Sequence, residues 1–329
     1  MTVFVTGASG FVGAAVVRAL CTRGEDVRVL LRPGRTGPNL QDLAVEQVTG
    51  DLREVAGFAE KLKGCSALYH IAADYRLWAR HPQDLYDTNV TGTQDLIAAA
   101  VQAGVQRIVY TSSVAVLGLH TDGSPSDEDT PVALTDMIGH YKRSKFLAEQ
   151  SVQRLVAEQN APVVIVNPST PIGPCDVRPT PTGRIIVEAA RGRMPAYVET
   201  GLNVVHVDDV AHGHLLAHDR GRIGARYILG GADMTLGAIL RLVAAETGKP
   251  APRVKLPHGL VMPIAAISEA LAQLTGKEPF ATRDGVRMAR KHMYFSSAKA
   301  ERDLGYVARP AAEAIKDAVA WFGANGYLD

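Results

Sequence analysis

The chain has 329 residues, of which 47% are hydrophobic and 21% charged, and its 35 Lys and Arg nearly balance its 34 Asp and Glu. This composition is typical of a globular protein and excludes a disordered or fibrous chain. The net charge of +1 gives no overall attraction to nucleic acid or an anionic membrane, so we expect a small-molecule ligand and no nucleic-acid partner.

The first predicted element is a strand, Thr2–Thr6, which runs directly into a glycine-rich loop that opens a helix. The glycines of this loop are spaced G-x-x-G-x-x-G. A strand, a tight turn and a helix N-terminus present free backbone N–H groups and a positive dipole end to a pyrophosphate. The loop therefore predicts a dinucleotide site that includes Gly7, Ser9, Gly10, Phe11, Val12 and Gly13.

The end of the next predicted strand, at 27–31, bears on the choice of dinucleotide. An NAD-specific site places a carboxylate there to accept from the ribose hydroxyls, but this strand is followed by Arg32 and then Arg35. A guanidinium suits a ribose 2′-phosphate, so the sequence favours NADP(H). NAD(H) stays the alternative, with Arg32 as a solvated loop residue.

Further Val- and Ile-rich runs at 67–71, 107–111 and 163–167 alternate with helical stretches. This alternation predicts a Rossmann-type, doubly wound parallel α/β sheet. A Pro- and Gly-rich stretch leaves the sheet after residue 167, and strands at 203–207 and 225–231 return to it before a mostly helical segment. We predict a dinucleotide-binding domain of residues 1–167 and 203–231, and a smaller C-terminal substrate lobe of residues 168–202 and 232–329.

Three residues near the middle of the chain carry candidate chemistry. Ser113 follows the strand at 107–111, and Tyr141 and Lys145 are four residues apart, on one face of a helix expected over 142–159. A phenol with an ordinary pKa of about 10 is a poor base, but an adjacent ammonium and an oxidised nicotinamide favour the phenolate. Tyr141 would then move a proton while Ser113 orients the substrate oxygen. Ser112 competes with Ser113 for this role.

The glycine spacing, Ser113 and the Tyr-x-x-x-Lys pair, in this order, resemble the extended short-chain dehydrogenases/reductases, which include nucleotide-sugar epimerases and dihydroflavonol reductases. The resemblance covers the whole chain and supports Ser113, because it lies five residues before Gly118. It implies a structural more than a catalytic role for Asn89, and a homodimer through helices near 85–103 and 142–159. Further cofactor contacts implied by the resemblance are Asp51, Leu52, Ala72, Ala73, Pro168, Ser169 and Thr170, together with Tyr141 and Lys145.

Within this family, the segments 72–78, 167–174 and 200–209 are similar to a sugar epimerase associated with hopanoid biosynthesis. That similarity makes Arg76, Trp78 and His206 candidate substrate residues. A surface arginine, a packed tryptophan and a hydrogen-bonded histidine are the respective alternatives. Cys175 lies where a related epimerase/reductase has a catalytic histidine, and is a weaker candidate.

Two departures from the family pattern limit the expected reaction. Val114 and Ala115 stand where sugar dehydratases carry an Asp-Glu pair, so dehydration is not expected. Leu202 stands where UDP-sugar epimerases carry an arginine that clamps the diphosphate. The basic stretch 287–292 is a candidate replacement for that charge, with a solvated helical face as the alternative.

We expect an enzyme that uses NADP(H) on a carbon of a sugar, polyol or lipid-linked substrate, namely a hopanoid-associated sugar epimerase. The main alternative is an NADPH-dependent carbonyl reductase that resembles dihydroflavonol reductase. A third hypothesis is a dinucleotide-sensing binding protein without turnover, although such proteins usually lose the Tyr or the Lys.

The cysteines and the hydrophobic runs bear on location. Cys21, Cys65 and Cys175 are too widely spaced for a disulfide framework or a zinc site, which predicts no bound metal and a cytoplasmic location. No apolar run reaches the roughly 18 residues that a membrane span needs. The stretch 260–274 is interpreted as an amphipathic helix of the substrate lobe, with a monotopic membrane contact as the alternative.

Overall fold

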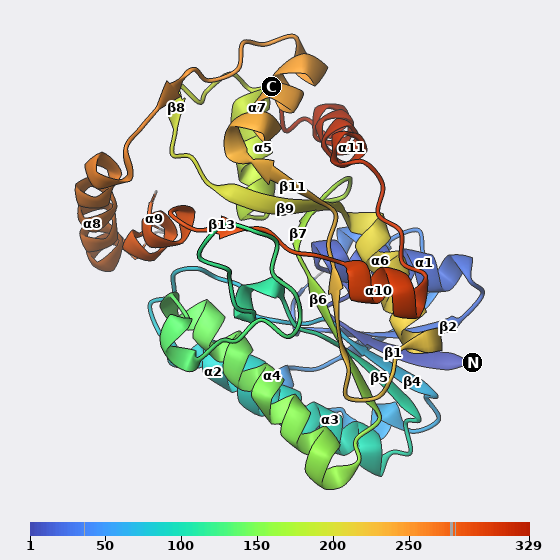
Figure 1. The fold of residues 1–329 in the computed structure, drawn as a ribbon. Coiled ribbons are helices and arrows are strands. Elements are labelled where there is room, and N and C mark those ends of the chain that lie inside the picture. Colours follow the sequence, from blue (N-terminus) through green and yellow to red (C-terminus); the bar gives the residue numbers. More distant parts are fainter. Residues whose placement is uncertain (36, 277–278, 280) are drawn as a thin grey trace.

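A seven-stranded sheet forms the centre of the molecule (Figure 1). The computed structural model describes residues 1–35, 37–276, 279 and 281–329. The strand order is β10-β6-β5-β4-β1-β2-β3, and all neighbouring pairs are parallel. The bounds are β1 Thr2–Thr6, β2 Asp26–Leu31, β3 Val45–Thr49, β4 Ala67–His70, β5 Arg107–Thr111, β6 Val163–Pro168 and β10 Arg226–Leu229. Because the chain order reverses between β1 and β4, a ligand crevice is expected at their carboxyl ends.

Helices cover both faces of this sheet, as Figure 1 shows. Val3 and Val5 of β1 pack into one hydrophobic core with three helices of the first face, and Phe4 packs into the other core with two helices of the second face. The bounds on the first face are α1 Phe11–Thr22, α6 Val207–Arg220 and α10 Ala298–Leu304, and on the second α2 Gln83–Tyr86, α3 Gly92–Gln102 and α4 Gly139–Gln159. The prediction of a doubly wound Rossmann-type sheet is confirmed.

Most predicted strands of this sheet are found within one residue of their expected ends, but β3 was missed. It lies at the edge of the sheet and pairs only with β2 among the described residues. Glu46, Gln47 and Thr49 are exposed, and Val48 alone is buried. A strand that buries so few side chains has no clear hydrophobic pattern in the sequence.

A second, four-stranded sheet lies above the first (Figure 1). In it β9 pairs with β7, β11 and β13. The expectation that the strand at 203–207 returns to the main sheet is therefore wrong, because β10 occupies the place beside β6. The expected strand at 225–231 is β10 and does lie in the main sheet. The bounds are β7 Thr170–Ile172, β9 Gly201–His206, β11 Ala232–Thr235 and β13 His292–Met293.

Three helices pack against this second sheet and share a separate hydrophobic core with it. They are α5 Pro181–Ala190, α7 Leu236–Thr247 and α11 Ala311–Ala324. A short parallel pair, β8 Ala196–Tyr197 and β12 Val254–Lys255, leads to two helices that stand apart from this core, α8 His258–Thr275 and α9 Arg283–Ala289 (Figure 1). The C-terminal part of the chain is thus mostly helical around a small sheet.

Short helical turns complete the described chain. The 3₁₀ turns are Pro38–Leu40, Leu52–Gly57, Ala59–Leu62, Val114–Val116 and Leu134–Asp136, and a π-helical turn spans Asp87–Thr91. Among the described residues, none of the helices combines the length and the apolar character needed to cross a bilayer.

Candidate active site

The glycine loop lies at the crevice between β1 and β4. Gly7 has a φ of +75°, and a Cβ there would lie 2.6 Å from the backbone nitrogen of Ala72. A Cβ on Gly13 would lie 2.0 Å from the carbonyl oxygen of Gly7, so α1 approaches the loop more closely than any side chain permits. Gly10 precedes α1 and offers no side-chain cap, which leaves the first N–H groups of the helix free for an anion. This cradle fits a dinucleotide pyrophosphate.

Arginines line a cavity of about 360 Å³ at the end of β2. Arg32, Arg35 and Arg53 contribute to it, together with Ala73 and Tyr75. In the described part of the chain, the Arg32 and Arg35 guanidiniums have no side-chain partner. Unpaired guanidiniums at this position fit a ribose 2′-phosphate. Arg53 was missed by the sequence analysis, although it follows the Gly-Asp-Leu segment that marked Asp51.

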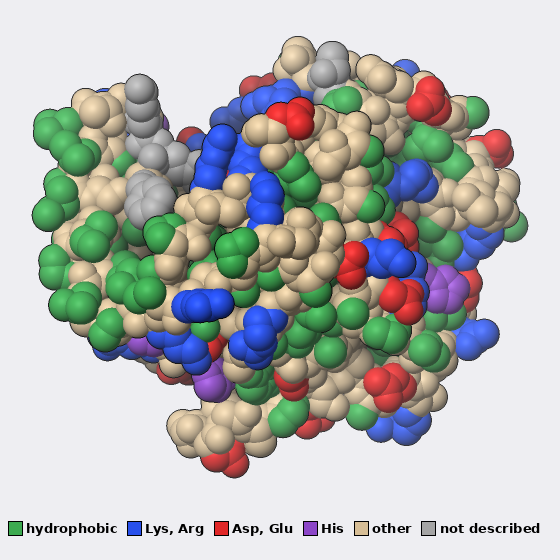
Figure 2. Space-filling model, turned by 90° about the horizontal axis from the view of Figure 1, so that it is seen from above, with side chains coloured by type: hydrophobic (Ala, Val, Ile, Leu, Met, Phe, Trp, Pro, Cys, Tyr) green, Lys and Arg blue, Asp and Glu red, His purple; other side chains and the backbone are tan. Residues whose placement is uncertain are grey.

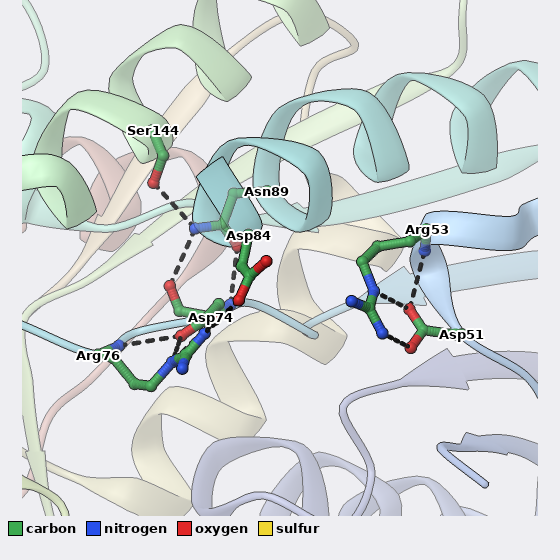
Figure 3. A network of polar contacts seen from close by, with 7 residues as sticks. All are labelled: Asp51, Arg53, Asp74, Arg76, Asp84, Asn89 and Ser144. Atoms are coloured by element: carbon green, nitrogen blue, oxygen red, sulfur yellow. Dashed lines mark hydrogen bonds and ion pairs between the residues drawn. The ribbon is translucent and has the colours of Figure 1, made fainter. Parts of the chain in front are cut away.

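Asp51, expected at the adenine, forms a bidentate ion pair with Arg53 (Figure 3). Its Oδ2 accepts from Arg53 Nη2 at 2.7 Å and its Oδ1 from the Arg53 backbone N–H at 2.9 Å. The hydrogen bond to Arg53 lowers the pKa of Asp51. Leu52, which follows it, is buried in the core between the sheet and α3. Asp51 is therefore an ionised acceptor at the edge of the arginine-lined cavity.

Ser113 and Tyr141 come together at the carboxyl end of β5. Ser113 ends the extended segment, and its Oγ accepts from the Ala115 backbone N–H at 3.1 Å. Burial raises the pKa of the Tyr141 phenol, and a hydrogen bond with the Ser113 side chain opposes that shift. A hydroxyl and a phenol in this arrangement can hold one substrate oxygen between them.

Lys145 is buried one turn further along α4. Its Nζ donates to the Tyr110 hydroxyl at 3.0 Å and to the Thr111 carbonyl at 2.9 Å. Burial lowers the pKa of Lys145 to about 8. An ammonium has three donors, so one N–H remains for a ligand such as a ribose hydroxyl. The sequence analysis did not single out Tyr110, which directly precedes the Thr-Ser-Ser segment.

Several buried polar atoms near these residues have no hydrogen-bond partner within the described structure. They are Ser112 Oγ, Asn167 Oδ1 and Ser169 Oγ, at or just beyond the carboxyl ends of β5 and β6. The amide nitrogen of Asn167 is held by the Ser113 carbonyl at 3.1 Å and by Glu149 at 2.8 Å. Unsatisfied buried polar atoms are rare in folded proteins and fit a polar ligand that reaches this crevice. Pro168 and Thr170, the other residues expected near the nicotinamide, flank Ser169 on β6 and β7.

Asn89 connects the segment after β4 with α4 (Figure 3). Its Oδ1 accepts from the Asp74 backbone N–H at 2.7 Å, and its Nδ2 donates to the Asp74 carbonyl and to Ser144 Oγ, each at 2.9 Å. Asn89 is 1% exposed, and these hydrogen bonds to other residues of the protein occupy both its amide oxygen and its amide nitrogen. This arrangement supports the structural role expected for it.

Arg76 and Trp78 line a cleft of about 390 Å³ between the segment after β4 and helices α8 and α9. Arg76 forms a bidentate ion pair with Asp74 and lies 3.8 Å from Asp84 (Figure 3). His140, the residue before Tyr141, also lines the cleft. The structure thus brings these two substrate candidates together beside the first turn of α4.

His206 and Cys175 lie in different surroundings from this cleft. His206 Nδ1 accepts from the Asp208 backbone N–H and from Arg309 Nη2, both at 3.0 Å, and its Nε2 lies 3.2 Å from Asp317. Both ring nitrogens are occupied, which favours the hydrogen-bonded, structural alternative for His206. Cys175 has a left-handed φ of +72°, and its carbonyl accepts from Asn39 Nδ2 at 3.0 Å.

Leu202, which stands where UDP-sugar epimerases carry an arginine that binds the diphosphate, lies on β9. Leu202 pairs with Met293 of β13 and Met234 of β11, and packs against the core of the second sheet. His292, the end of the basic stretch, is paired with Gly201. Only the end of the stretch 287–292 is therefore shown beside Leu202, whereas Arg287 lies on α9 and is bonded to Asp284 at 3.2 Å.

Lys142, next to Tyr141, is 8% exposed and has no carboxylate partner in the described structure. Its Nζ lies 4.0 Å from the sulfur of Met293. Burial, helped by the charge of Lys291, lowers the pKa of Lys142 to about 8 from its ordinary 10.5. Its buried charge is therefore a cost to the folded state.

We expect Lys142→Met to raise the free energy of unfolding by about 1–3 kcal/mol at pH 7, because it removes this buried charge. Between about pH 8 and 10.5 the folded wild type releases the proton that the unfolded chain keeps, so wild-type stability rises with pH and the difference shrinks. Urea unfolding at several pH values measures this. Lys316→Met, at an exposed position on α11, is the control. A variant less stable than wild type at pH 7 would contradict the prediction.

The parallel sheet with a reversal between β1 and β4, and the glycine cradle at that reversal, define a dinucleotide-dependent enzyme of the extended short-chain dehydrogenase/reductase type. The chain belongs to the NAD dependent epimerase/dehydratase family, whose model matches residues 3–230. The resemblance found in the sequence is thus confirmed at the level of the family.

Curated relatives and solved structures agree with this assignment. A Synechocystis sp. protein named "Putative dihydroflavonol 4-reductase" is 44% identical over 99% of this chain and 95% of its own length. Sterol demethylase protein B of Methylococcus capsulatus is 38% identical over the whole of both chains. The crystal structure of gox2253 is 52% identical, with a TM-score of 0.90 over 100% of this chain and 99% of the other. A Streptomyces venezuelae dTDP-glucose 4,6-dehydratase solved with NAD is 25% identical, with a TM-score of 0.81 over 99% and 98%.

Proposed function

We propose that this protein is an NADP(H)-dependent reductase or dehydrogenase that interconverts a hydroxyl and a carbonyl group of a small, largely apolar substrate. The observation that carries this proposal is the meeting of Ser113 and Tyr141 beside the glycine cradle. The nicotinamide, when bound, supplies hydride transfer at the substrate carbon. The names of the curated relatives, a dihydroflavonol reductase and a sterol demethylase protein, support reduction or oxidation of an apolar substrate.

In the proposed reaction, the Ser113 hydroxyl holds the substrate oxygen and the Tyr141 phenol gives it a proton, or takes one in the reverse direction. Lys145 fixes this end of α4 through Tyr110 and Thr111, and its third N–H is free to hold the cofactor ribose.

The apolar character of the substrate is supported by Leu202, which offers no charge for a nucleotide diphosphate. A second candidate function, epimerisation of a sugar or polyol carbon, in particular on a hopanoid-linked substrate, is supported by the resemblance of segments 72–78, 167–174 and 200–209. The sugar-nucleotide dehydratase with the same fold also favours it. An epimerase returns the hydride to the substrate and consumes no cofactor overall.

The test of the proposed function is NADPH absorbance at about 340 nm in the presence of carbonyl probes. Dihydroquercetin and 3-oxodecanoate serve as the apolar probes, and UDP-glucose as the sugar probe. Steady NADPH oxidation with an apolar probe supports the reductase. Isomerised UDP-glucose without net change in NADPH would support the epimerase and overturn the reductase.

The NADP(H) preference is tested by removing the two unpaired arginines. We expect Arg32→Ser/Arg35→Ser to lower kcat/KM for NADPH by about 10²–10⁴-fold, since each of the two charge-assisted bonds to a 2′-phosphate contributes about 1.5–3 kcal/mol. The value for NADH should change by less than about threefold. Arg154→Ser, an exposed arginine on α4, is the charge-matched control for a single removal. An unchanged ratio between the two cofactors would show that neither arginine meets the 2′-phosphate.

Three further expectations stay predictions. The homodimer through α3 and α4 rests on the family resemblance, and the cytoplasmic location on cysteine usage. The division into residues 1–167 with 203–231 and residues 168–202 with 232–329 would place β9 with the dinucleotide domain. Limited proteolysis and light scattering of the purified protein test the division and the dimer.

A further inference from the structure

Helix α8 exposes an unusually apolar surface. Of its residues, Ala265 and Ala272 are buried, whereas five large aliphatic side chains are more than half exposed. Those five are Leu260 at 65%, Ile264 at 52%, Ile267 at 63%, Leu271 at 55% and Leu274 at 84%. In Figure 1 the helix stands at the edge of the molecule, away from both sheets. A helix that buries two alanines and exposes five aliphatic residues is expected to have a partner outside this chain.

The five side chains form one stripe, because their spacing alternates between four and three residues. The other exposed residues of α8 include Gly259, Pro263 and Gln273, and none of the exposed ones is charged. The one acidic residue of the helix, Glu269, turns inward and bonds Arg283 at 2.6 Å. Figure 2 shows hydrophobic side chains gathered at this edge of the molecule. We call Leu260, Ile264, Ile267, Leu271 and Leu274 the α8 stripe.

The chain around the α8 stripe is strongly basic. Residues 253–291 contain seven Lys and Arg against three Asp and Glu, a net charge of +4, whereas the whole chain has +1. The remainder of the chain is therefore at −3. Arg253, Arg290 and Lys291 are exposed, and their side chains have no acidic partner among the described residues. Two copies of this surface would repel each other, whereas an anionic bilayer would attract it.

The opposite side of α8 faces the substrate cleft. Ala266, Ala270 and Gln273 line that cleft together with Trp78 and His140. The helix therefore separates the cleft beside the catalytic helix from the apolar stripe outside. This position suits a helix that rests on a lipid surface while the cleft opens next to it.

We propose that α8 docks in the plane of an anionic lipid bilayer, with the α8 stripe inserted among the acyl chains and the basic residues of 253–291 near the headgroups. The helix lies on the membrane and does not cross it, in keeping with its length and its Pro263. Burial of the five side chains supplies the affinity, and the basic residues make it depend on anionic lipid and on salt.

The experiment is flotation of the full chain with vesicles of phosphatidylcholine that contain phosphatidylglycerol, and with pure phosphatidylcholine vesicles. We expect flotation with the anionic vesicles that weakens at high salt. Ile267→Glu/Leu271→Glu should lower the vesicle-bound fraction by about 10-fold or more, because charges in the stripe cannot enter the bilayer. The matched control is Ile223→Glu/Val307→Glu, at aliphatic residues that are 52% and 77% exposed elsewhere, and it should float like wild type.

Circular dichroism of both double variants shows that they are folded. A wild type that does not float, or an α8 variant that floats as well as the control, overturns the proposal. Light scattering tests the alternative that a second copy of the chain, and not a membrane, covers the α8 stripe. If wild type is a dimer and Ile267→Glu/Leu271→Glu alone makes it a monomer, a second copy covers the stripe and the membrane assignment is wrong.

Discussion

Replacement of Tyr141 by Phe is expected to lower kcat by about 10²–10⁴-fold while NADPH binding changes by less than about threefold. The phenol is the proposed proton donor, and the Ser113 side chain at the carboxyl end of β5 opposes the rise that burial causes in its pKa. Phe keeps the ring and its packing, so the fold and the cofactor cradle should remain. The measurements are steady-state turnover of the probe that proves active and a fluorescence titration with NADPH.

A control variant removes a comparable hydroxyl far from this site. Tyr327→Phe loses a hydrogen bond from the phenol to the Val177 carbonyl, 2.7 Å long, near the C-terminus, and should keep turnover close to wild type. If Tyr141→Phe retained full activity, the catalytic assignment would be wrong. A wild type that binds NADPH and turns over none of the probes would instead support the third hypothesis, a dinucleotide-sensing binding protein.

The strand and the helix that carry the candidate catalytic residues were predictable, because these residues lie in short segments whose own pattern indicates their structure. Ser113 lies two residues beyond the end of β5, and the four-residue spacing of Tyr141 and Lys145 places both on one face of α4. The helix begins at Gly139, three residues before the expected start at residue 142, and so contains Tyr141. Helix periodicity and strand ends depend on neighbouring residues in the sequence, so they can be predicted without knowing which segments meet in the fold.

Contacts between distant segments were not predictable in the same way. His206 looked like a substrate residue at a strand end, but it bonds Arg309 and Asp317, which lie more than 100 residues further along the chain. Tyr110 reaches the site only because β5 meets α4, where Lys145 donates to its hydroxyl. A single sequence gives the spacing within a segment and holds no comparable signal for which segments meet.

The placement of β9 shows the same limit for the fold. Its sequence is a good strand, and a strand was correctly expected there. Whether β9 joined the main sheet or formed a separate one depended on two other strands. β7 pairs with β9, and β10 occupies the edge of the main sheet beside β6. Strand propensity reports the extended backbone and leaves the choice of partner to packing.

Substitution of Gly13 by Ala is expected to weaken NADPH binding by about 10–100-fold and to lower the free energy of unfolding by about 1–3 kcal/mol. The added Cβ would lie 2.0 Å from the Gly7 carbonyl oxygen and 2.6 Å from its carbonyl carbon. Both atoms belong to the backbone of the cradle itself, so α1 can admit the methyl group only by moving away from the loop. That shift would displace the backbone N–H groups at the start of α1, which we expect to hold the pyrophosphate.

The measurements for Gly13→Ala are a fluorescence titration with NADPH and urea unfolding without cofactor. Gly57→Ala is the matched control, because a Cβ there meets no atom within 4 Å and its φ is not in the left-handed region. It should bind NADPH like wild type and unfold within about 0.5 kcal/mol of it. If Gly13→Ala also bound NADPH like wild type, the pyrophosphate would lie elsewhere than at this loop. A variant that lost stability and kept its affinity would show instead that the close approach of α1 to Gly7 serves packing alone.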